Sequence, residues 1–364
     1  MRPQGDRQSV RKAADEAPLQ IGIIGCGVIA PTHAEGYGEC AGIRLRWACD
    51  LVESKAKAFA ERFGVPRVTA DYRTVLADPE LDAVSICTDH ASHAEIAVAA
   101  IEAGKHVLCE KALAATTAGL DRMLAAHRAR PDRVFAGVLQ HRFDRLYRLL
   151  HDLVREGDFG TPLTANLQVQ CLRTPAYYRA DCWRGTWAEE GGSVMINQAI
   201  HFVDILDWIM GGAAAIAGAF SNRTHAGAIE TEDTAVAALR FRDGALGTIA
   251  ATSSSNLHWE PSFYVYGSAG SIDIRNGSVQ RIALKDAARQ AEVEARFLDT
   301  REPRQLPSGK TYYGAGHAEL ILDFVAAIRE GRPPRIPAVE ARRAVDLVLA
   351  LYRSHREQRW VALG

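Results

Sequence analysis

The sequence has no long hydrophobic run. No stretch of its 364 residues approaches the roughly 20 apolar residues that a membrane-spanning helix needs. The net charge is also small, at −1 near pH 7, so the chain has no overall electrostatic attraction to nucleic acid or to anionic lipid. We therefore expect neither a nucleic-acid partner nor a membrane partner. Residues 1–18 are polar, mixed in charge and without the apolar core of a signal peptide, which predicts a flexible tail on a cytoplasmic protein.

The seven cysteines show no metal-binding pattern. Their number is odd, no two are spaced as Cys-x-x-Cys, and several lie in apolar runs, where cysteine behaves as a small buried hydrophobic residue. His90 and His93 are three residues apart, but no set of cysteines or carboxylates completes a site with them. We therefore expect no metal ion.

A chain of 364 residues is longer than a single hydrophobic core usually accommodates, which predicts two domains. The pattern of apolar and polar residues changes once along it. From residue 19 to residue 141, short apolar runs alternate with helix-compatible segments, which predicts a Rossmann domain with a doubly wound parallel sheet. From residue 142 to residue 364, runs of alternating polarity are separated by Asp-Gly and Asn-Gly turn signals. This predicts an α+β domain with a large open, mostly antiparallel sheet. We assign no element to residues 279–307.

A glycine-rich turn follows the first apolar run. The order Gly25-x-Gly27-x-x-Ala30 is the dinucleotide-binding fingerprint, because Gly25 permits a tight turn and Gly27 lets the backbone approach a pyrophosphate. The helix expected next would offer its N-terminus to the phosphates. The residues predicted to contact a dinucleotide here are Gly25, Gly27, Val28 and Ile29.

Asp50 ends the second predicted strand, about 20 residues after the glycines. A carboxylate at this place hydrogen-bonds the ribose hydroxyls of NAD and repels the 2′-phosphate of NADP, and Leu51 offers no cation to that phosphate. We therefore expect NAD as the cofactor, with NADP less favoured. Asp50 could also cap the helix predicted from residue 53, and one residue can do both.

Polar residues follow three later predicted strands, 83–87, 106–109 and 134–138. Thr88 stands after the first, Glu110 and Lys111 after the second, and Gln140 after the third. Ligands of a doubly wound sheet bind outside the carboxyl ends of its strands. We therefore expect Thr88, Glu110 and Gln140 to contact the cofactor and Lys111 to reach the reacting atoms.

A strongly apolar helix is predicted over residues 191–212, with Ser193 as its N-cap. Asn197, His201 and Asp204 fall at helical spacing and share one narrow stripe. Polar groups that are buried in a core either form hydrogen bonds there or serve a function such as catalysis. The stripe is therefore either a satisfied interior network or part of an active site.

From residue 19 onward the chain resembles the Gfo/Idh/MocA oxidoreductases. The resemblance rests on the glycine fingerprint, on Asp50, on the run Val-Leu-Cys-Glu-Lys that ends at Lys111, and on the two glycines before Asn197, His201 and Asp204. It implies a Rossmann domain followed by an α/β domain with a large open sheet, and dehydrogenase activity. Two positions depart from the family pattern: Ala112 replaces a proline after Lys111, and Asn197 stands where many members carry aspartate.

Oxidation of a secondary alcohol needs a proton acceptor and a group that stabilises the developing alkoxide. Asparagine cannot exchange a proton at neutral pH, so we expect His201 to accept the proton. Lys111 would hold and polarise the substrate oxygen, and Asn197 would orient the substrate or the histidine. The reverse assignment of Lys111 and His201 stays open. For Asp204 we expect a structural role.

An aromatic and arginine-rich segment precedes the predicted helix. The run 183–187, together with Asn197 and Gln198, resembles the branch of the family that oxidises sugars, glycosides and nucleotide sugars, often at C3 of a pyranose. This implies substrate contacts from Trp183, Arg184, Gln198 and Tyr177, although aromatic and arginine side chains equally suit an interface. Tyr312, Tyr313 and His317 form a second cluster that could reach the same cleft.

Two other functions stay open. An inositol or cyclitol dehydrogenase would use the same site with a different pocket, whereas a non-catalytic NAD-binding regulator would need neither Lys111 nor His201. We favour a dehydrogenase because both residues are present. An open sheet face often pairs with a copy of itself, so we expect a homodimer or homotetramer that acts on a small sugar-like substrate.

Overall fold

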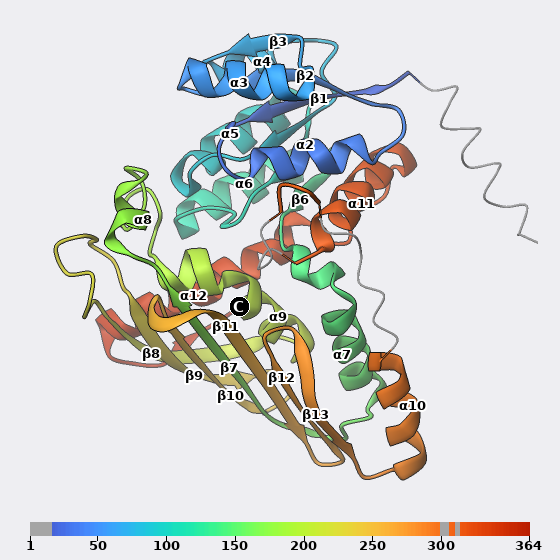
Figure 1. Cartoon of the computed structure of the whole chain (residues 1–364), viewed down its shortest axis with the longest axis vertical. Helices are drawn as coiled ribbons and strands as arrows, with labels where there is room; N and C mark the ends of the chain where they lie inside the picture. Colours follow the sequence, from blue (N-terminus) through green and yellow to red (C-terminus); the bar gives the residue numbers. More distant parts are fainter. Residues whose placement is uncertain (1–16, 299–305, 310–313) are drawn as a thin grey trace, which may run out of the picture.

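The computed structural model describes residues 17–298, 306–309 and 314–364, and it contains two sheets, one above the other in Figure 1. Residues 1–16 of the predicted tail, together with Tyr312 and Tyr313, lie outside the described residues. The first sheet has six strands in the order β3-β2-β1-β4-β5-β6, and every pair is parallel. Its strands are β1 (Leu19–Ile24), β2 (Ile43–Cys49), β3 (Arg67–Thr69), β4 (Ala83–Ile86), β5 (His106–Cys109) and β6 (Phe135–Gly137). This confirms the predicted Rossmann sheet.

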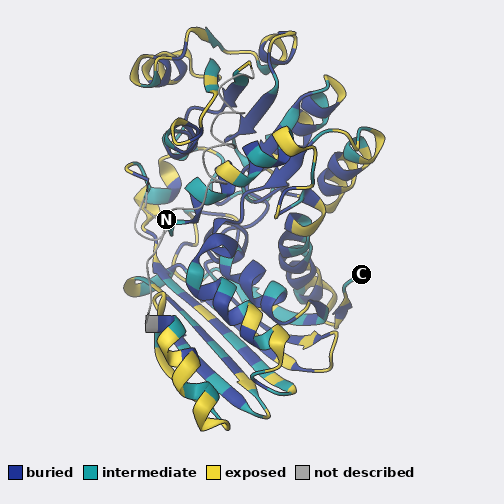
Figure 2. Ribbon diagram, turned by 90° about the vertical axis from the view of Figure 1, so that its right-hand side faces the viewer, coloured by how far each residue is buried: buried dark blue, intermediate teal, exposed yellow. Residues whose placement is uncertain are grey.

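Strands β1 and β4 lie side by side where the order of the sheet reverses, which is where such sheets bind ligands. All four residues of β4 are buried, and Figure 2 shows the central strands of this sheet mostly in dark blue between the flanking helices. The helices that connect the strands are α2 (Ala30–Gly38), α3 (Glu53–Phe63), α4 (Tyr72–Leu76), α5 (His90–Glu102) and α6 (Thr117–Ala129). Helix α5 begins at His90, where the Asp89 carboxylate accepts the Ser92 N–H at 3.0 Å and caps it.

The second sheet has eight strands in the order β13-β12-β11-β7-β10-β9-β8-β14. All of its pairs are antiparallel except β7 with β10, so the predicted mostly antiparallel sheet is confirmed. Its strands are β7 (Pro162–Leu172), β8 (Ala213–Ser221), β9 (Thr234–Phe241), β10 (Leu246–Thr252), β11 (Ser254–Gly267), β12 (Gly270–Arg275), β13 (Ser278–Leu284) and β14 (Val361–Ala362). Residues that the sequence left unassigned form β13 and, after it, helix α10 (Ala287–Leu298).

Two helices near the C-terminus join the two sheets. Helix α12 (Ala338–Glu357) packs on β8 of the second sheet, and Pro337, just before it, forms a β-bridge with Ala136 of the first. Helix α11 (Gly316–Glu330) packs against α2. A single cluster of buried side chains therefore runs through both sheets and fixes one relative to the other. None of the helices within the described ranges is long and apolar enough to cross a membrane.

The helix predicted over residues 191–212 is two segments, the π-helical turn η2 (Val194–Ala199) and the α-helix α9 (Ile200–Ile209). The prediction that Ser193 caps it is wrong. The Ser193 hydroxyl donates to Tyr178 Oη at 3.1 Å, and its N–H donates to the buried carboxylate of Glu232. A π-helical turn is wider than an α-helical one and is common at functional sites. The remaining segments are η1 (Gln140–Phe143), α7 (Arg145–Glu156) and α8 (Pro175–Arg179).

Candidate active site

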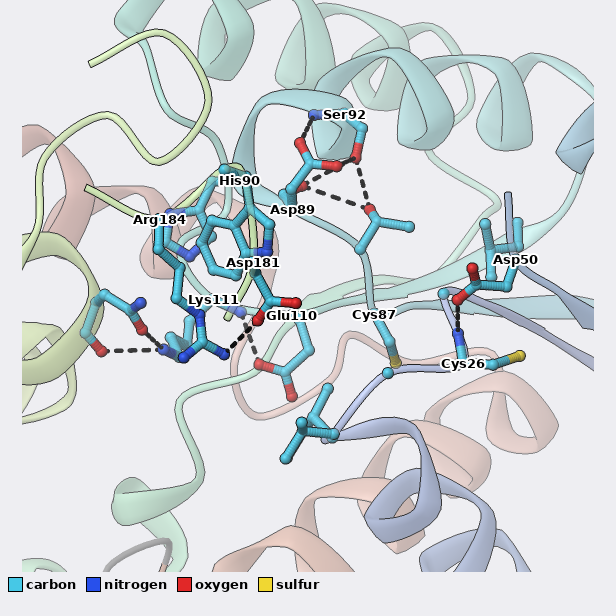
Figure 3. Close-up of a pocket in the computed structure, with 18 of the residues that line it drawn as sticks. Cys26, Asp50, Cys87, Asp89, His90, Ser92, Glu110, Lys111, Asp181 and Arg184 are labelled. Carbon is cyan, nitrogen blue, oxygen red and sulfur yellow. Dashed lines mark hydrogen bonds and ion pairs between the residues drawn. The ribbon is translucent and has the colours of Figure 1, made fainter. Parts of the chain in front are cut away.

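A cleft of about 760 Å³ runs from the carboxyl ends of the first sheet to η2 and α9 (Figure 3). Every residue that the sequence assigned to the site lines it. These residues are Gly25, Gly27, Val28, Ile29, Asp50, Thr88, Glu110, Lys111, Gln140, Tyr177, Trp183, Arg184, Asn197, Gln198 and His201. His317 of the second predicted cluster lines it too. The fold therefore gathers residues from both domains around one cavity.

The glycine turn leaves its backbone open to this cleft. Gly25 has a φ of +91°, and a Cβ there would lie 2.5 Å from the carbonyl oxygen of Cys87, so no other residue fits without a shift. A Cβ on Gly27 would meet nothing within 4 Å, which leaves space for a ligand beside its backbone. Helix α2 begins at Ala30 without a side-chain cap on its N-terminus. The turn and the helix end fit a pyrophosphate.

The Asp50 carboxylate is held at the edge of the cleft. Its oxygens accept the N–H of Cys26 at 2.9 Å and the N–H of Val52 at 2.8 Å. The N-cap of α3 is Val52, so Asp50 closes a turn before the helix and does not cap it. This placement fits the ribose of NAD. Sequence reasoning missed Lys55, a cation on the first turn of α3 that also lines the cleft.

Glu110 is buried behind Lys111. Burial by itself would raise the pKa of this carboxyl, but the hydrogen bond with His33 Nε2 at 2.9 Å brings the pKa down to about 2. Its other oxygen accepts the backbone N–H of Lys111 at 3.0 Å. Glu110 is therefore ionised at neutral pH and anchors the segment that carries the lysine. The Lys111–Ala112 peptide bond is cis.

The Lys111 ammonium is held by η2. Its Nζ donates to Asn197 Oδ1 at 2.6 Å and to the Asn197 carbonyl oxygen at 3.0 Å. Burial lowers the pKa of Lys111 to about 8, and Arg184 and Arg173 push it the same way against the opposite pull of Glu110 and Glu190. A lysine with this pKa exchanges its proton near neutral pH.

His201 lies on the same cleft as a neutral imidazole. Burial lowers the pKa of His201 well below its usual 6.5, and the positive charge of Lys111 adds to this, as do His141 and His317. Its Nδ1 has no hydrogen-bond partner among the described residues, and its ring meets that of His141 edge-on at 5.4 Å between centroids. Among these groups Lys111 therefore holds its proton more strongly than His201.

Asp204 does not line the cleft and instead pairs with an arginine of the first turn after β6, which is a structural role. The Asp204 carboxylate accepts hydrogen bonds from Nε and Nη2 of the buried Arg142 at 2.8 and 2.7 Å. Arg142 also donates to the Glu340 carboxylate at 2.7 Å. A buried carboxylate paired in this way is committed to the fold. Only Asn197 and His201 of the predicted stripe reach the cleft.

The far end of the cleft is rich in arginine and aromatic rings. Arg173 Nη2 donates to Gln198 Oε1 at 2.6 Å, and Gln198 Nε2 donates to Tyr177 Oη at 3.0 Å. The Arg184 guanidinium lies 4.1 Å from the centroid of the Tyr177 ring and pairs with Asp181 at 2.9 Å. Flat rings and guanidinium donors suit the faces and hydroxyls of a sugar.

Sequence reasoning missed Arg173, which lines this end, and Glu190, which does not line the cleft but binds Asn197. Arg173 follows β7, and the pattern of that strand gave no reason to single it out. Glu190 is fully buried although it directly precedes two glycines. It accepts Asn197 Nδ2 and the Gly185 N–H, the latter at 2.5 Å, and burial raises its pKa to about 7.

The two histidines on α5, His90 and His93, make hydrogen bonds with backbone carbonyl groups. His90 Nδ1 donates to the Glu190 carbonyl at 2.8 Å, and the His93 ring nitrogens lie within hydrogen-bond distance of the Ala112 and Thr88 carbonyls. In the part of the chain that the structure describes, no group of three or more His, Cys, Asp or Glu side chains is placed to hold a metal ion.

Two family descriptions match the chain. Residues 19–138 match the Gfo/Idh/MocA oxidoreductase family, NAD-binding Rossmann fold, and residues 151–363 match the C-terminal alpha/beta domain of the same family. Myo-inositol 2-dehydrogenase of Thermotoga maritima is 28% identical over 348 residues, which is 95% of this chain and 98% of that protein. Levoglucosan dehydrogenase of Pseudarthrobacter phenanthrenivorans is 25% identical over 393 residues, 94% of this chain and 97% of that one.

Among solved structures, the chain is similar to the WlbA dehydrogenase from Bordetella pertussis, determined in complex with NADH and UDP-GlcNAcA. The TM-score is 0.86 at 26% sequence identity, and the match covers 96% of this chain and 99% of that one.

Proposed function

This chain belongs to the Gfo/Idh/MocA family of NAD-binding oxidoreductases, and on that premise we propose that it oxidises a secondary alcohol of a sugar, glycoside or nucleotide sugar, with C3 of a pyranose as the candidate carbon. One observation carries this proposal: the amine of Lys111 and the imidazole of His201 line the same cleft as the glycine turn and Asp50. NAD, when bound, supplies the hydride acceptor.

We propose that Lys111 takes the hydroxyl proton. The sequence favoured His201 for this role and left the reverse open, and the two pKa directions support the reverse. A base works best when its pKa lies near the working pH, and the pKa of Lys111 is about 8 while that of His201 falls well below 6.5. His201 would then hold the substrate oxygen, and Asn197 would keep the amine in place through its 2.6 Å contact.

The arginine and aromatic end of the cleft supports a substrate rich in hydroxyls. Tyr177, Trp183, Arg184 and Gln198 would contact its ring. The WlbA structure contains UDP-GlcNAcA, and another relative is named levoglucosan dehydrogenase, which agrees with this assignment. The relative named myo-inositol 2-dehydrogenase makes a cyclitol the second candidate.

The test is the formation of NADH, followed by its absorbance between about pH 7 and 10, a range that brackets the usual pKa of lysine. The panel contains pyranoses, glycosides, nucleotide sugars and cyclitols. We expect turnover with members of the first three groups, with a kcat/KM that rises through about pH 8 as Lys111 loses its proton. Turnover of cyclitols alone selects the second candidate. NAD binding with no turnover of any compound would support the regulator that the sequence left open.

We propose a homodimer or homotetramer that uses the open face of the second sheet. Alternate residues of β9 and β10 point away from the buried face, and among them Val236 is 51% and Leu246 is 55% exposed. Light scattering with size-exclusion chromatography measures the assembly. Leu246→Arg should reduce the measured mass, and a wild-type monomer contradicts the proposal.

We propose a cytoplasmic location from the state of the thiols. All seven cysteines are free, and six of them are buried. A chain that works in an oxidising compartment tends to pair its cysteines. Fractionation of cells that express the protein tests this.

A further inference from the structure

Glu190 does not line the cleft, yet two successive hydrogen bonds through Asn197 link it to the amine of Lys111. Lys111 Nζ donates to Asn197 Oδ1 at 2.6 Å, and Asn197 Nδ2 donates to Glu190 Oε1. The second oxygen, Oε2, accepts the N–H of Gly185 at 2.5 Å. Both oxygens of the Glu190 carboxylate are therefore engaged by donors, and one of these donors belongs to the side chain that holds the lysine.

This chain of contacts fixes the orientation of the Asn197 amide. An amide has an acceptor on one side and donors on the other, and here the acceptor faces an ammonium while the donor faces a carboxylate. Rotated by half a turn, the amide would point its NH₂ at Lys111 and its oxygen at Glu190, and both contacts would become repulsive. Asn197 thus has one favourable orientation as long as Glu190 is an acceptor.

Glu190 also contributes charge to a site that is otherwise crowded with cations. Arg173 and Arg184 act against a proton on Lys111, whereas Glu110 and Glu190 favour it. The neighbouring imidazoles of His90 and His201 are both kept neutral, since burial lowers the pKa of each well below its usual value. Glu190 itself is 0% exposed, and burial, with a smaller contribution from Glu232, raises its pKa to about 7, so it is mostly ionised near pH 8, where Lys111 exchanges its proton. Its charge therefore acts on Lys111 with little screening by water.

We propose that Glu190 is a positioning residue for Lys111: through the Asn197 amide it holds the amine in place, and with its charge it sets the proton affinity of that amine. This inference rests on the proposed function only for its effect on turnover. Its effect on the lysine can be measured without substrate or cofactor.

The test is Glu190→Gln, which keeps the size of the side chain. A glutamine has one acceptor and one donor group, so it cannot accept from both Asn197 and Gly185. Either the Gly185 N–H loses its acceptor, or the Asn197 amide turns over and presents NH₂ to Lys111. The negative charge is lost in both cases, so the proton affinity of Lys111 should fall. Glu189→Gln makes the same chemical change at the neighbouring exposed residue and is the matched control.

Lys111 can be titrated directly by NMR on protein labelled with ¹³C at the lysine Cε. The chain has seven lysines, and the signal that disappears in Lys111→Met identifies the one of interest. We expect the titration midpoint of the Lys111 amine to lie about one pH unit lower in Glu190→Gln than in the wild type. In Glu189→Gln the midpoint should equal that of the wild type. In the pH profile of kcat/KM, the rising limb should move to lower pH by the same amount, and the Kd for NADH should not change. A midpoint equal to that of the wild type in folded Glu190→Gln overturns the proposal.

Glu190→Asp keeps the charge and is the second variant, for the case in which glutamine prevents folding. Its carboxylate is one methylene shorter and cannot reach Asn197 and Gly185 together. We expect a Lys111 midpoint close to that of the wild type together with a kcat lowered on the order of tenfold. A kcat equal to that of the wild type contradicts the positioning role. A shifted midpoint in Glu190→Gln with no turnover of any alcohol leaves this inference standing and removes the proposed function instead.

Discussion

The two ends of the cleft are built by different kinds of contact. At the cofactor end, near neighbours in the sequence supply much of the geometry, and the longer contacts stay within the first domain. Gly25 has a positive φ, Asp50 accepts the N–H of Val52 as well as that of Cys26, and Thr88 accepts the Ser92 hydroxyl at 2.7 Å. At the substrate end, the contact that holds the amine joins the first domain to the second. Lys111 and Asn197 are separated by 86 residues.

This difference predicts different responses to mutation. A local motif folds with its strand and its turn, so a substitution there should change cofactor binding or the turn itself. The substrate end exists only once both sheets are packed, so a substitution there can remove catalysis while the cofactor end stays intact. The variants below test that separation, from the largest expected effect to the smallest.

Arg142→Met should give the largest effect, because it leaves the buried Asp204 carboxylate without its arginine partner. Removing one member of a buried ion pair costs about 3–5 kcal/mol of the free energy of unfolding. Denaturant unfolding measures this loss. The double variant Arg142→Met with Asp204→Leu should recover most of it, and a single variant as stable as the wild type contradicts the structural role.

Lys111→Met should lower kcat on the order of 100-fold or more, because the group that exchanges the proton is lost. The Kd for NADH, measured by its fluorescence, should stay within about threefold of the wild type, since the cofactor end is built by other residues. Equal loss of binding and turnover would show that the two ends are not separable.

A pair of glycine substitutions sharpens the comparison at the cofactor end. Gly25→Ala places a methyl group 2.5 Å from the Cys87 carbonyl oxygen at a positive φ, and it should cost about 2 kcal/mol of stability. Gly27→Ala meets no atom within 4 Å, so its stability should change by less than about 0.5 kcal/mol while its Kd for NAD rises about tenfold. Thermal unfolding and NADH titration distinguish the two. Equal stability of both variants would contradict the close approach of Gly25 to Cys87.

Asp50→Ala should have the smallest effect. Loss of the carboxylate should weaken NAD binding by about tenfold and reduce the preference for NAD over NADP, with Lys55 available to the 2′-phosphate. Comparison of kcat/KM with the two cofactors measures this. An unchanged ratio would mean that Asp50 does not contact the ribose.

The same separation explains how far the sequence could be interpreted. The glycine turn, Asp50 and the strand ends were predictable because the chemistry of each depends on a few consecutive residues. Strand β8 was missed because its run of alanines has no period in polarity. The π-helical turn η2 was predicted as part of a regular helix, since nothing in its residues distinguishes the two, and the assumed cap at Ser193 failed with it.

Glu190 shows why the substrate end was only partly predictable. Its role depends on Gly185, on Asn197 and on burial that arises when the two sheets pack, and none of these can be inferred from a pair of glutamates before two glycines. Lys111, Asn197 and His201 were identified because each lies at a strand end or on a polar stripe. The contact that joins the first two is a property of the folded chain.

The most direct test of the account is a crystal structure with NADH and an alcohol that the enzyme turns over. The account predicts the nicotinamide ring between Gly27 and Lys111, with the hydroxyl of the alcohol within about 3.5 Å of both Lys111 Nζ and a ring nitrogen of His201. A nicotinamide ring that lies away from Lys111, or a hydroxyl that contacts neither side chain, would contradict it.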